Sequence, residues 1–171
     1  SWSAHLARAF GVPEVDLAST GTVGEEATTG AAFRSEYYGL APHVQEAADL
    51  PSGRPLLTTG LVDLAHAAWG ERAARVAGRR WASPVVDVAA LEGRAAAWAS
   101  RSAAPKLIIA TQTRVVEVVV DADGRFVPGV PLVVAWAPAA RLWALAAALA
   151  SPPITAWAAS RSAGTALAPG A

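Results

Sequence analysis

The alternation of apolar and polar positions divides the chain into a helical start, a β-rich middle and a helical end. Near the N-terminus, Trp2, Leu6 and Phe10 recur four residues apart, which is the spacing of one helix face. Gly11 and Pro13 follow and are typical helix-ending residues. The pattern therefore predicts a short helix whose apolar face packs against another element.

The strongest strand signals are three runs rich in β-branched residues, at 106–110, 115–120 and 125–134. Asp123 and Gly124 lie between the second and third runs, and an Asp-Gly pair there predicts a hairpin turn. Residues 56–62 predict a further strand, interrupted by Gly60.

Three alanine-rich segments predict helices in the second half of the chain, at 91–102, 139–150 and 154–161. Pro152 and Pro153 separate the last two, and proline is favoured in the first turn of a helix. These elements predict an α+β fold: a mixed or antiparallel β core with a hairpin, flanked by helices at both ends.

Composition limits the chemistry. The chain has 171 residues, enough for one domain, and no cysteine, which excludes disulfides and thiolate metal sites. His5, His43 and His66 show no metal-ligand spacing, so no metal is expected. The most apolar stretch, 130–150, contains two prolines and an arginine. We therefore expect no membrane span and a cytoplasmic location.

Charge is balanced, with 14 basic and 14 acidic residues and a formal net charge of zero. Free-standing nucleic-acid-binding domains are usually basic. The neutral total therefore favours other partners unless the positive charges gather on one face.

No recognisable catalytic motif is present. The chain has no Gly-x-Ser-x-Gly segment, no phosphate-binding glycine loop and no Asn-Pro-Pro-aromatic segment, because Ser151 and Ile154 flank its Pro-Pro pair. We therefore expect the chain to carry no catalytic residue and no cofactor, and not to be an enzyme by itself.

Several weak motifs follow one another along the chain. They are the Gly-to-Phe segment at 30–34, the aromatic segment at 33–40, the strand at 56–63, the Pro-Lys, apolar strand and polar end at 105–114, the Leu-rich helix at 142–151 and the helix at 154–164. Their order resembles the TaqI-like specificity domains of bacterial, in particular actinobacterial, DNA adenine methyltransferases. The resemblance covers residues 21–171. Ala150 stands where the family has Asn, and the neutral charge and single Lys also depart from it.

The resemblance implies a target-recognition domain at 13–171 in a fragment of a longer restriction-modification protein. Residues 1–12 would be a helix linking it to an upstream catalytic domain in cis. That catalytic domain would bind S-adenosylmethionine and methylate a flipped adenine. The recognition domain would bind double-stranded DNA, reading base edges in the major groove and holding phosphates.

Polar side chains at the ends of the predicted strands, and arginines elsewhere, are the candidates for this contact. Gln can pair bidentately with adenine and Arg with guanine, and cations hold phosphates. The candidate DNA-binding residues are Lys106, Thr111, Gln112, Thr113, Arg114, Arg34, Arg79 and Arg80.

Two other classes of function stay open. The first is a non-catalytic protein-interaction or structural domain that does not bind DNA, which the zero net charge favours. The second is a small hydrolase or ligand-binding domain, which no spacing of His, Ser or acidic residues supports. An upstream Asn-Pro-Pro-aromatic motif in the full reading frame would favour the methyltransferase.

Overall fold

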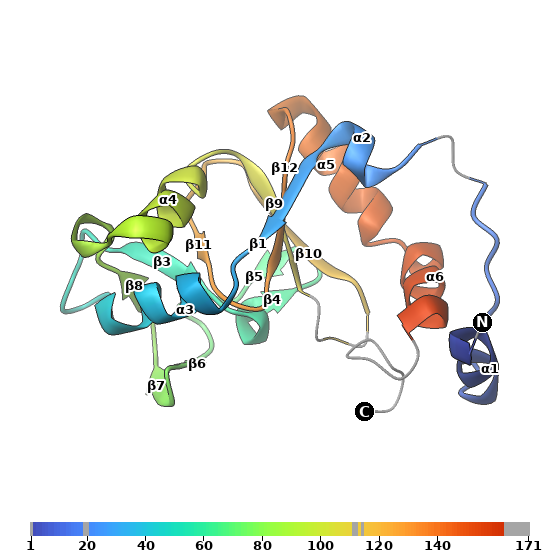
Figure 1. The fold of residues 1–171 in the computed structure, drawn as a ribbon, viewed down its shortest axis with the longest axis horizontal. Helices are drawn as coiled ribbons and strands as arrows, with labels where there is room; N and C mark the ends of the chain where they lie inside the picture. The colour runs from blue at the N-terminus through green and yellow to red at the C-terminus, as the bar shows by residue number, and fades with distance from the viewer. Residues whose placement is uncertain (1, 19–20, 111–112, 114, 163–171) are drawn as a thin grey trace.

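The computed structural model describes residues 2–18, 21–110, 113 and 115–162, and shows helices at both ends of a β core (Figure 1). The first half contains α1 (Trp2–Ala9), α2 (Val23–Glu26), β1 (Thr28–Ala31), α3 (Arg34–Leu40), β2 (Val44–Glu46), β3 (Arg54–Leu57), β4 (Val62–Asp63), β5 (His66–Ala67), β6 (Ala74–Val76), β7 (Arg79–Trp81) and β8 (Pro84–Val86). The second half contains α4 (Gly93–Arg101), β9 (Lys106–Ala110), β10 (Glu117–Asp121), β11 (Val127–Pro128), β12 (Val133–Trp136), α5 (Ala139–Leu149) and α6 (Pro152–Ser162). The predicted α+β class, with a mixed β core and terminal helices, is confirmed.

The first sheet is antiparallel, and its strand β9 is largely buried on both faces. Its strand order is β1-β12-β9-β10. Successive side chains of a strand point to opposite faces, so Leu107 packs with Leu142 of α5 while Ile108 packs with Leu61 on the other side. The continuous apolar run of β9 therefore serves two separate cores, and α5 covers one face.

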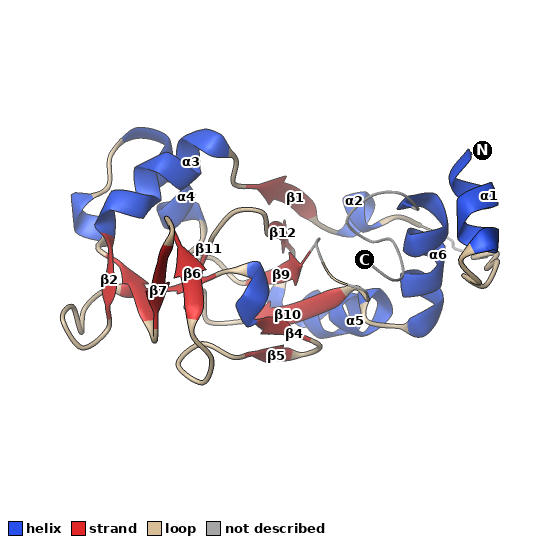
Figure 2. Cartoon of the chain, turned by 90° about the horizontal axis from the view of Figure 1, so that it is seen from below, coloured by secondary structure: helices blue, strands red, loops and turns tan. Residues whose placement is uncertain are grey.

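The second sheet has the order β11-β3-β8-β2, with β11 parallel to β3 and the other pairs antiparallel. The core that includes Val86 of this sheet also contains Leu40 of α3 and Trp98 of α4. Adjacent residues of β3 connect the two cores, because Leu56 belongs to the core of the second sheet and Leu57 to that of the first. Figure 2 shows the two sheets side by side, with α3 and α4 over the second.

The predicted hairpin at Asp123–Gly124 is wrong. The strand β10 pairs with β9, and the predicted strand at 125–134 is divided between β11 and β12, which lie in different sheets. The physical reason is the Asp121 carboxylate, which accepts hydrogen bonds from the backbone N–H groups of Arg125 (2.8 Å) and Phe126 (3.0 Å). Those bonds turn the chain out of the first sheet before it can form a second hairpin.

The helices at the end of the chain have the predicted positions. Helix α6 contacts α1, so the two ends of the described chain lie side by side (Figure 1). Within the described residues, no single helix is long and apolar enough to span a membrane. The pair α5 and α6 reaches that length and composition only when taken together, and it is bent by 67°.

A buried ionic network joins the elements of both sheets. Lys106 of β9 is completely buried, and its ammonium contacts the carboxylate of Asp121 on β10 and donates to the Ser102 carbonyl at 2.6 Å. Burial lowers the pKa of Lys106, and the ion pair with Asp121 opposes that change. The ammonium therefore depends on Asp121 for its charge in the interior.

Arg54 of β3 extends this network to the second sheet. Its guanidinium donates to the carbonyls of Ala99 (2.5 Å) and Ser102 (3.0 Å), which end α4, and to that of Gly124 (2.8 Å). A cation at a helix C-terminus is favourable because the last carbonyls carry partial negative charge. Arg54 and Lys106 therefore hold one end of α4 against both sheets.

We expect Asp121→Ala to lower the free energy of unfolding by about 3–5 kcal/mol, because it leaves a buried ammonium uncompensated. The measurement is urea unfolding of the 171-residue chain. Glu14→Ala breaks the exposed Arg8–Glu14 pair and is the matched control, expected to cost less than about 1 kcal/mol. Equal effects of the two substitutions would contradict the proposed importance of the network.

Candidate nucleic-acid interface

The β6–β7 hairpin is a short two-stranded ribbon that extends from the second sheet (Figures 1 and 2). Its turn is Ala77-Gly78, and both residues have positive φ (51° and 77°), as a two-residue hairpin turn of type I′ requires. Trp81 anchors the ribbon, because its ring is buried and its indole Nε1 donates to the Val76 carbonyl at 3.2 Å. The ribbon is therefore fixed to the body by its inward face.

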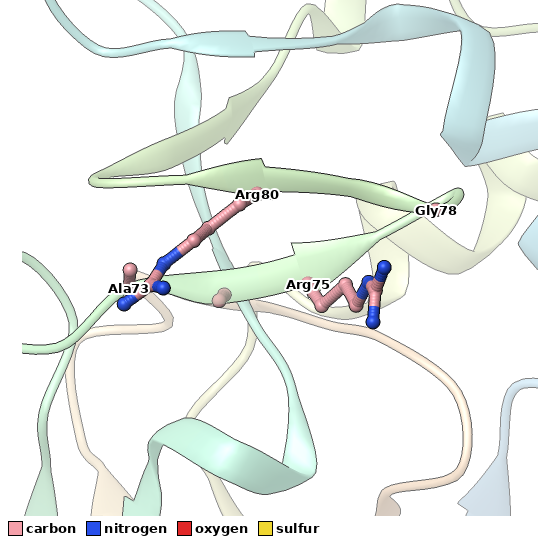
Figure 3. Close-up of a pocket in the computed structure, with 5 residues that line it drawn as sticks. Ala73, Arg75, Gly78 and Arg80 are labelled. Atoms are coloured by element: carbon pink, nitrogen blue, oxygen red, sulfur yellow. The ribbon is translucent and has the colours of Figure 1, made fainter.

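The outward face of the ribbon carries arginines. Arg75 and Arg80 are directly opposite each other in the register and are exposed. Their side chains line an open hollow of about 410 Å³, and their guanidinium groups point away from each other (Figure 3). Arg79 is also exposed, but it alternates with Arg80 along β7 and therefore lies on the same side of the ribbon as Trp81, 4.7 Å from the centre of that ring. Three cations therefore gather on six strand residues.

No carboxylate neutralises this ribbon. Within the described part of the chain, Arg75, Arg79 and Arg80 form no ion pair, and the cations that pair with a carboxylate all lie outside the ribbon. The ion pairs between Arg or Lys and a carboxylate are Arg8–Glu14, Arg72–Asp63, Arg94–Glu36, Lys106–Asp121 and Arg141–Glu26. The chain is neutral in total, yet the ribbon presents uncompensated positive charge.

Helix α3 extends the cationic surface with aromatic side chains. Phe33 and Tyr38 are 66% and 60% exposed, and the Arg34 guanidinium lies 5.5 Å from the centre of the Tyr38 ring. The Tyr37 ring meets that of Tyr38 edge to face, with centres 5.4 Å apart. Tyr37 also lines a small hollow, of about 60 Å³, together with Arg75 of the ribbon. Helix α3 and the ribbon are therefore neighbours at this hollow. We call their cationic and aromatic side chains together the arginine–aromatic face: Phe33, Arg34, Tyr37, Tyr38, Arg75, Arg79 and Arg80.

A buried carboxylate positions this end of α3. Glu36 is 5% exposed and accepts hydrogen bonds from Arg94 Nε on α4 (2.7 Å) and from the backbone N–H of Phe33 (2.9 Å). The bond from Arg94, followed by that from Phe33, lowers the pKa of Glu36 from 4.5 to about 2. Gly39 allows the close approach of the two helices, because a Cβ there would lie 2.6 Å from the Cβ of Ala95.

The structure separates the residues predicted to contact DNA into four groups. Arg34, Arg79 and Arg80 are exposed on the arginine–aromatic face. The prediction for Lys106 is wrong, because its ammonium is completely buried and bonded to Asp121 and Ser102. Thr111, Gln112 and Arg114 lie outside the described residues. Thr113 is partly exposed, and its hydroxyl donates to the Val115 carbonyl at 2.5 Å.

Sequence reasoning missed Arg75 and Phe33 as members of this face. The signal for Arg75 was available, because the turn at Ala77-Gly78 places it opposite Arg80 in a two-residue hairpin. Phe33 gave no such signal, since an aromatic residue before a helix is more often buried than exposed.

No group of three His, Asp or Glu side chains with the geometry of a metal site occurs among the described residues. The one histidine–carboxylate contact among the described residues joins His66 Nε2 and Glu71 Oε2, which are 2.9 Å apart and both exposed. What the arginine–aromatic face offers chemically is cationic donors and flat apolar rings, which suit a polyanion that carries aromatic groups.

We expect Glu36 to make folding pH-dependent in acid. Its carboxyl binds a proton less tightly in the folded chain than in the unfolded chain, so its stabilisation is complete above pH 4.5 and is lost as pH falls toward 2. Glu36→Gln should therefore destabilise the chain near neutral pH, and its difference from the wild type should shrink on acidification. Urea unfolding at a series of pH values measures this difference.

Arg94→Ala provides the matched variant, because the guanidinium is the largest cause of the lowered pKa. It should reduce the same pH dependence while leaving the carboxyl in place. If the free energies of unfolding of Glu36→Gln and the wild type differ by the same amount from neutral pH to pH 2, the stabilising role of the ionised Glu36 carboxylate is contradicted.

The chain has no match among protein-family models, curated proteins or solved structures.

Proposed function

We propose that the chain is the double-stranded-DNA-binding, target-recognition domain of an adenine-specific DNA methyltransferase. The observation that carries DNA binding is the exposed ribbon on which Arg75, Arg79 and Arg80 have no carboxylate partner among the described residues. The adenine-methyltransferase part rests on the order of motifs along the sequence. Catalysis and S-adenosylmethionine binding would belong to an upstream domain.

The shape of the ribbon supports this proposal. The major groove of B-DNA admits a two-stranded β-ribbon, and arginine is the residue that most often reads guanine there. Arg75 and Arg80 are opposite each other in the register, and their guanidinium groups point away from each other (Figure 3). Two cations that point apart can contact separate phosphates of one DNA backbone.

Neutral net charge is compatible with this function, since affinity for DNA follows the local field. The acidic residues are used elsewhere: Glu36 and Asp121 are buried, and Glu26 and Asp63 pair with Arg141 and Arg72. The described carboxylate beside the end of β7 is Glu46, which accepts from the backbone N–H groups of Ala82 (2.7 Å) and Ser83 (2.8 Å) and forms no ion pair with the arginines of the ribbon.

A protein-interaction domain is the second candidate, and one observation favours it. Helix α5 exposes an apolar face that includes Trp143, which is 67% exposed, and Ala144 and Ala147 beside it. Exposed apolar patches of this kind mark protein contacts. Under the first proposal, the same face is available to the catalytic domain in cis.

The test is fluorescence anisotropy of the 171-residue chain with a random-sequence duplex, between about 50 and 200 mM salt. The variant Arg75→Ala, Arg79→Ala, Arg80→Ala should bind more weakly. A plot of the logarithm of its association constant against the logarithm of salt concentration should be shallower, by about 3 in the magnitude of the slope. The matched control, Arg8→Ala, Arg141→Ala, Arg161→Ala, removes equal charge from α1, α5 and α6 and should bind like the wild type.

Equal binding by the two triple variants would contradict the ribbon as the DNA contact. No binding by the wild type at the lowest salt would favour the protein-interaction domain. The methyltransferase part has its own test in the full reading frame, where an upstream Asn-Pro-Pro-aromatic segment is expected.

A further inference from the structure

Phe33 is an exposed aromatic side chain on a main chain that is held at both ends. Its ring is 66% exposed, while its N–H donates to the buried Glu36 carboxylate (2.9 Å) and its carbonyl accepts from the Tyr37 N–H (2.9 Å). Glu36 is held in turn by Arg94 of α4. The exposure of Phe33 therefore belongs to a well-bonded part of the fold and does not come from a loose loop.

The two tyrosine rings of α3 contact other rings or a cation. Phe33, the residue just before α3, differs from them. Tyr38 contacts both Tyr37 and the Arg34 guanidinium. Among the described residues, no aromatic or cation–π contact involves Phe33. Phenylalanine also lacks a polar atom to bond with water. Phe33 therefore presents an uncovered, flat apolar surface.

The charges around Phe33 indicate what covers it. Arg34 follows it in the chain, and Arg75 reaches the same face through the hollow that it shares with Tyr37. The only acidic residue of α3, Glu36, is buried and paired, so no negative charge is presented there. A nucleotide carries both groups that suit this surface: a base whose face can stack on the Phe33 ring, and a phosphate that can contact the arginines.

We propose that Phe33 is a base-stacking residue, whose ring stacks on an unpaired nucleobase in DNA that the β6–β7 ribbon binds. Arg34 contacts the phosphate next to that nucleobase. This inference rests on the proposed DNA binding and adds a ligand class to it: duplex DNA with an unpaired base. In intact duplex the bases already stack on each other, so the ring gains a partner only where stacking is interrupted.

The test compares two duplexes of the same sequence, one fully paired and one with a single unpaired 2-aminopurine. The wild-type 171-residue chain should bind the second more tightly and quench its 2-aminopurine fluorescence. Phe33→Ala should weaken binding to that duplex by about tenfold, abolish the quenching and remove the preference for the unpaired base over the paired duplex. Phe33→Trp, which keeps an aromatic face, should retain both properties.

Trp143→Ala is the matched control, because it removes an equally exposed aromatic ring from α5, away from α3 (Figure 1). It should behave as the wild type on both duplexes. Wild-type chain that binds both duplexes equally, or Phe33→Ala that retains the preference, would overturn the stacking role and leave DNA binding intact. Absence of wild-type binding to either duplex would overturn both proposals.

Discussion

The contact between the buried Lys106 ammonium and the Asp121 carboxylate is the constraint on which the rest of the structure depends. A buried charge is tolerated only when it is paired and hydrogen-bonded, so Lys106 and Asp121 must lie on adjacent strands of one sheet. Asp121 also accepts two backbone N–H groups that turn the chain toward the second sheet. Arg54 then connects that sheet to the end of α4. A few ionic side chains thereby set how the two sheets and α4 meet.

The arginine–aromatic face is mounted on this frame. Trp81 joins the ribbon to the core of the second sheet, and the bond between Glu36 and Arg94 joins α3 to α4. Both attachments use buried groups, so the exposed side chains above them project from rigid elements. Rigid mounting matters for recognition, because side chains that are already in place lose less conformational entropy on binding.

The same face is where the chain departs from what stability alone would favour. Arg75 and Arg80 form no ion pair among the described residues, Ala77 adopts a positive φ of 51°, and the Phe33 side chain is exposed to water. Exposed apolar side chains also occur elsewhere, as at Trp143 of α5, and Ala65 also has a positive φ, of 59°. The combination of exposed aromatic rings with cations that lack a carboxylate partner is the physical basis for assigning a ligand to this surface.

The sequence by itself determined the local elements and the class of fold. The helices at 2–9, 93–101, 139–149 and 152–162, and the strand at 106–110, follow from periodicity and β-branched runs, which are properties of neighbouring residues. Only the tertiary structure decided which strands pair: an Asp-Gly turn predicted a hairpin, but the bonds of the Asp121 side chain direct the chain to another sheet. It also decided that Lys106 is an internal ion-pair partner and that Phe33 is exposed. The burial of a side chain and its contacts depend on residues that are distant in the chain, and a local sequence pattern does not indicate which distant groups will come into contact.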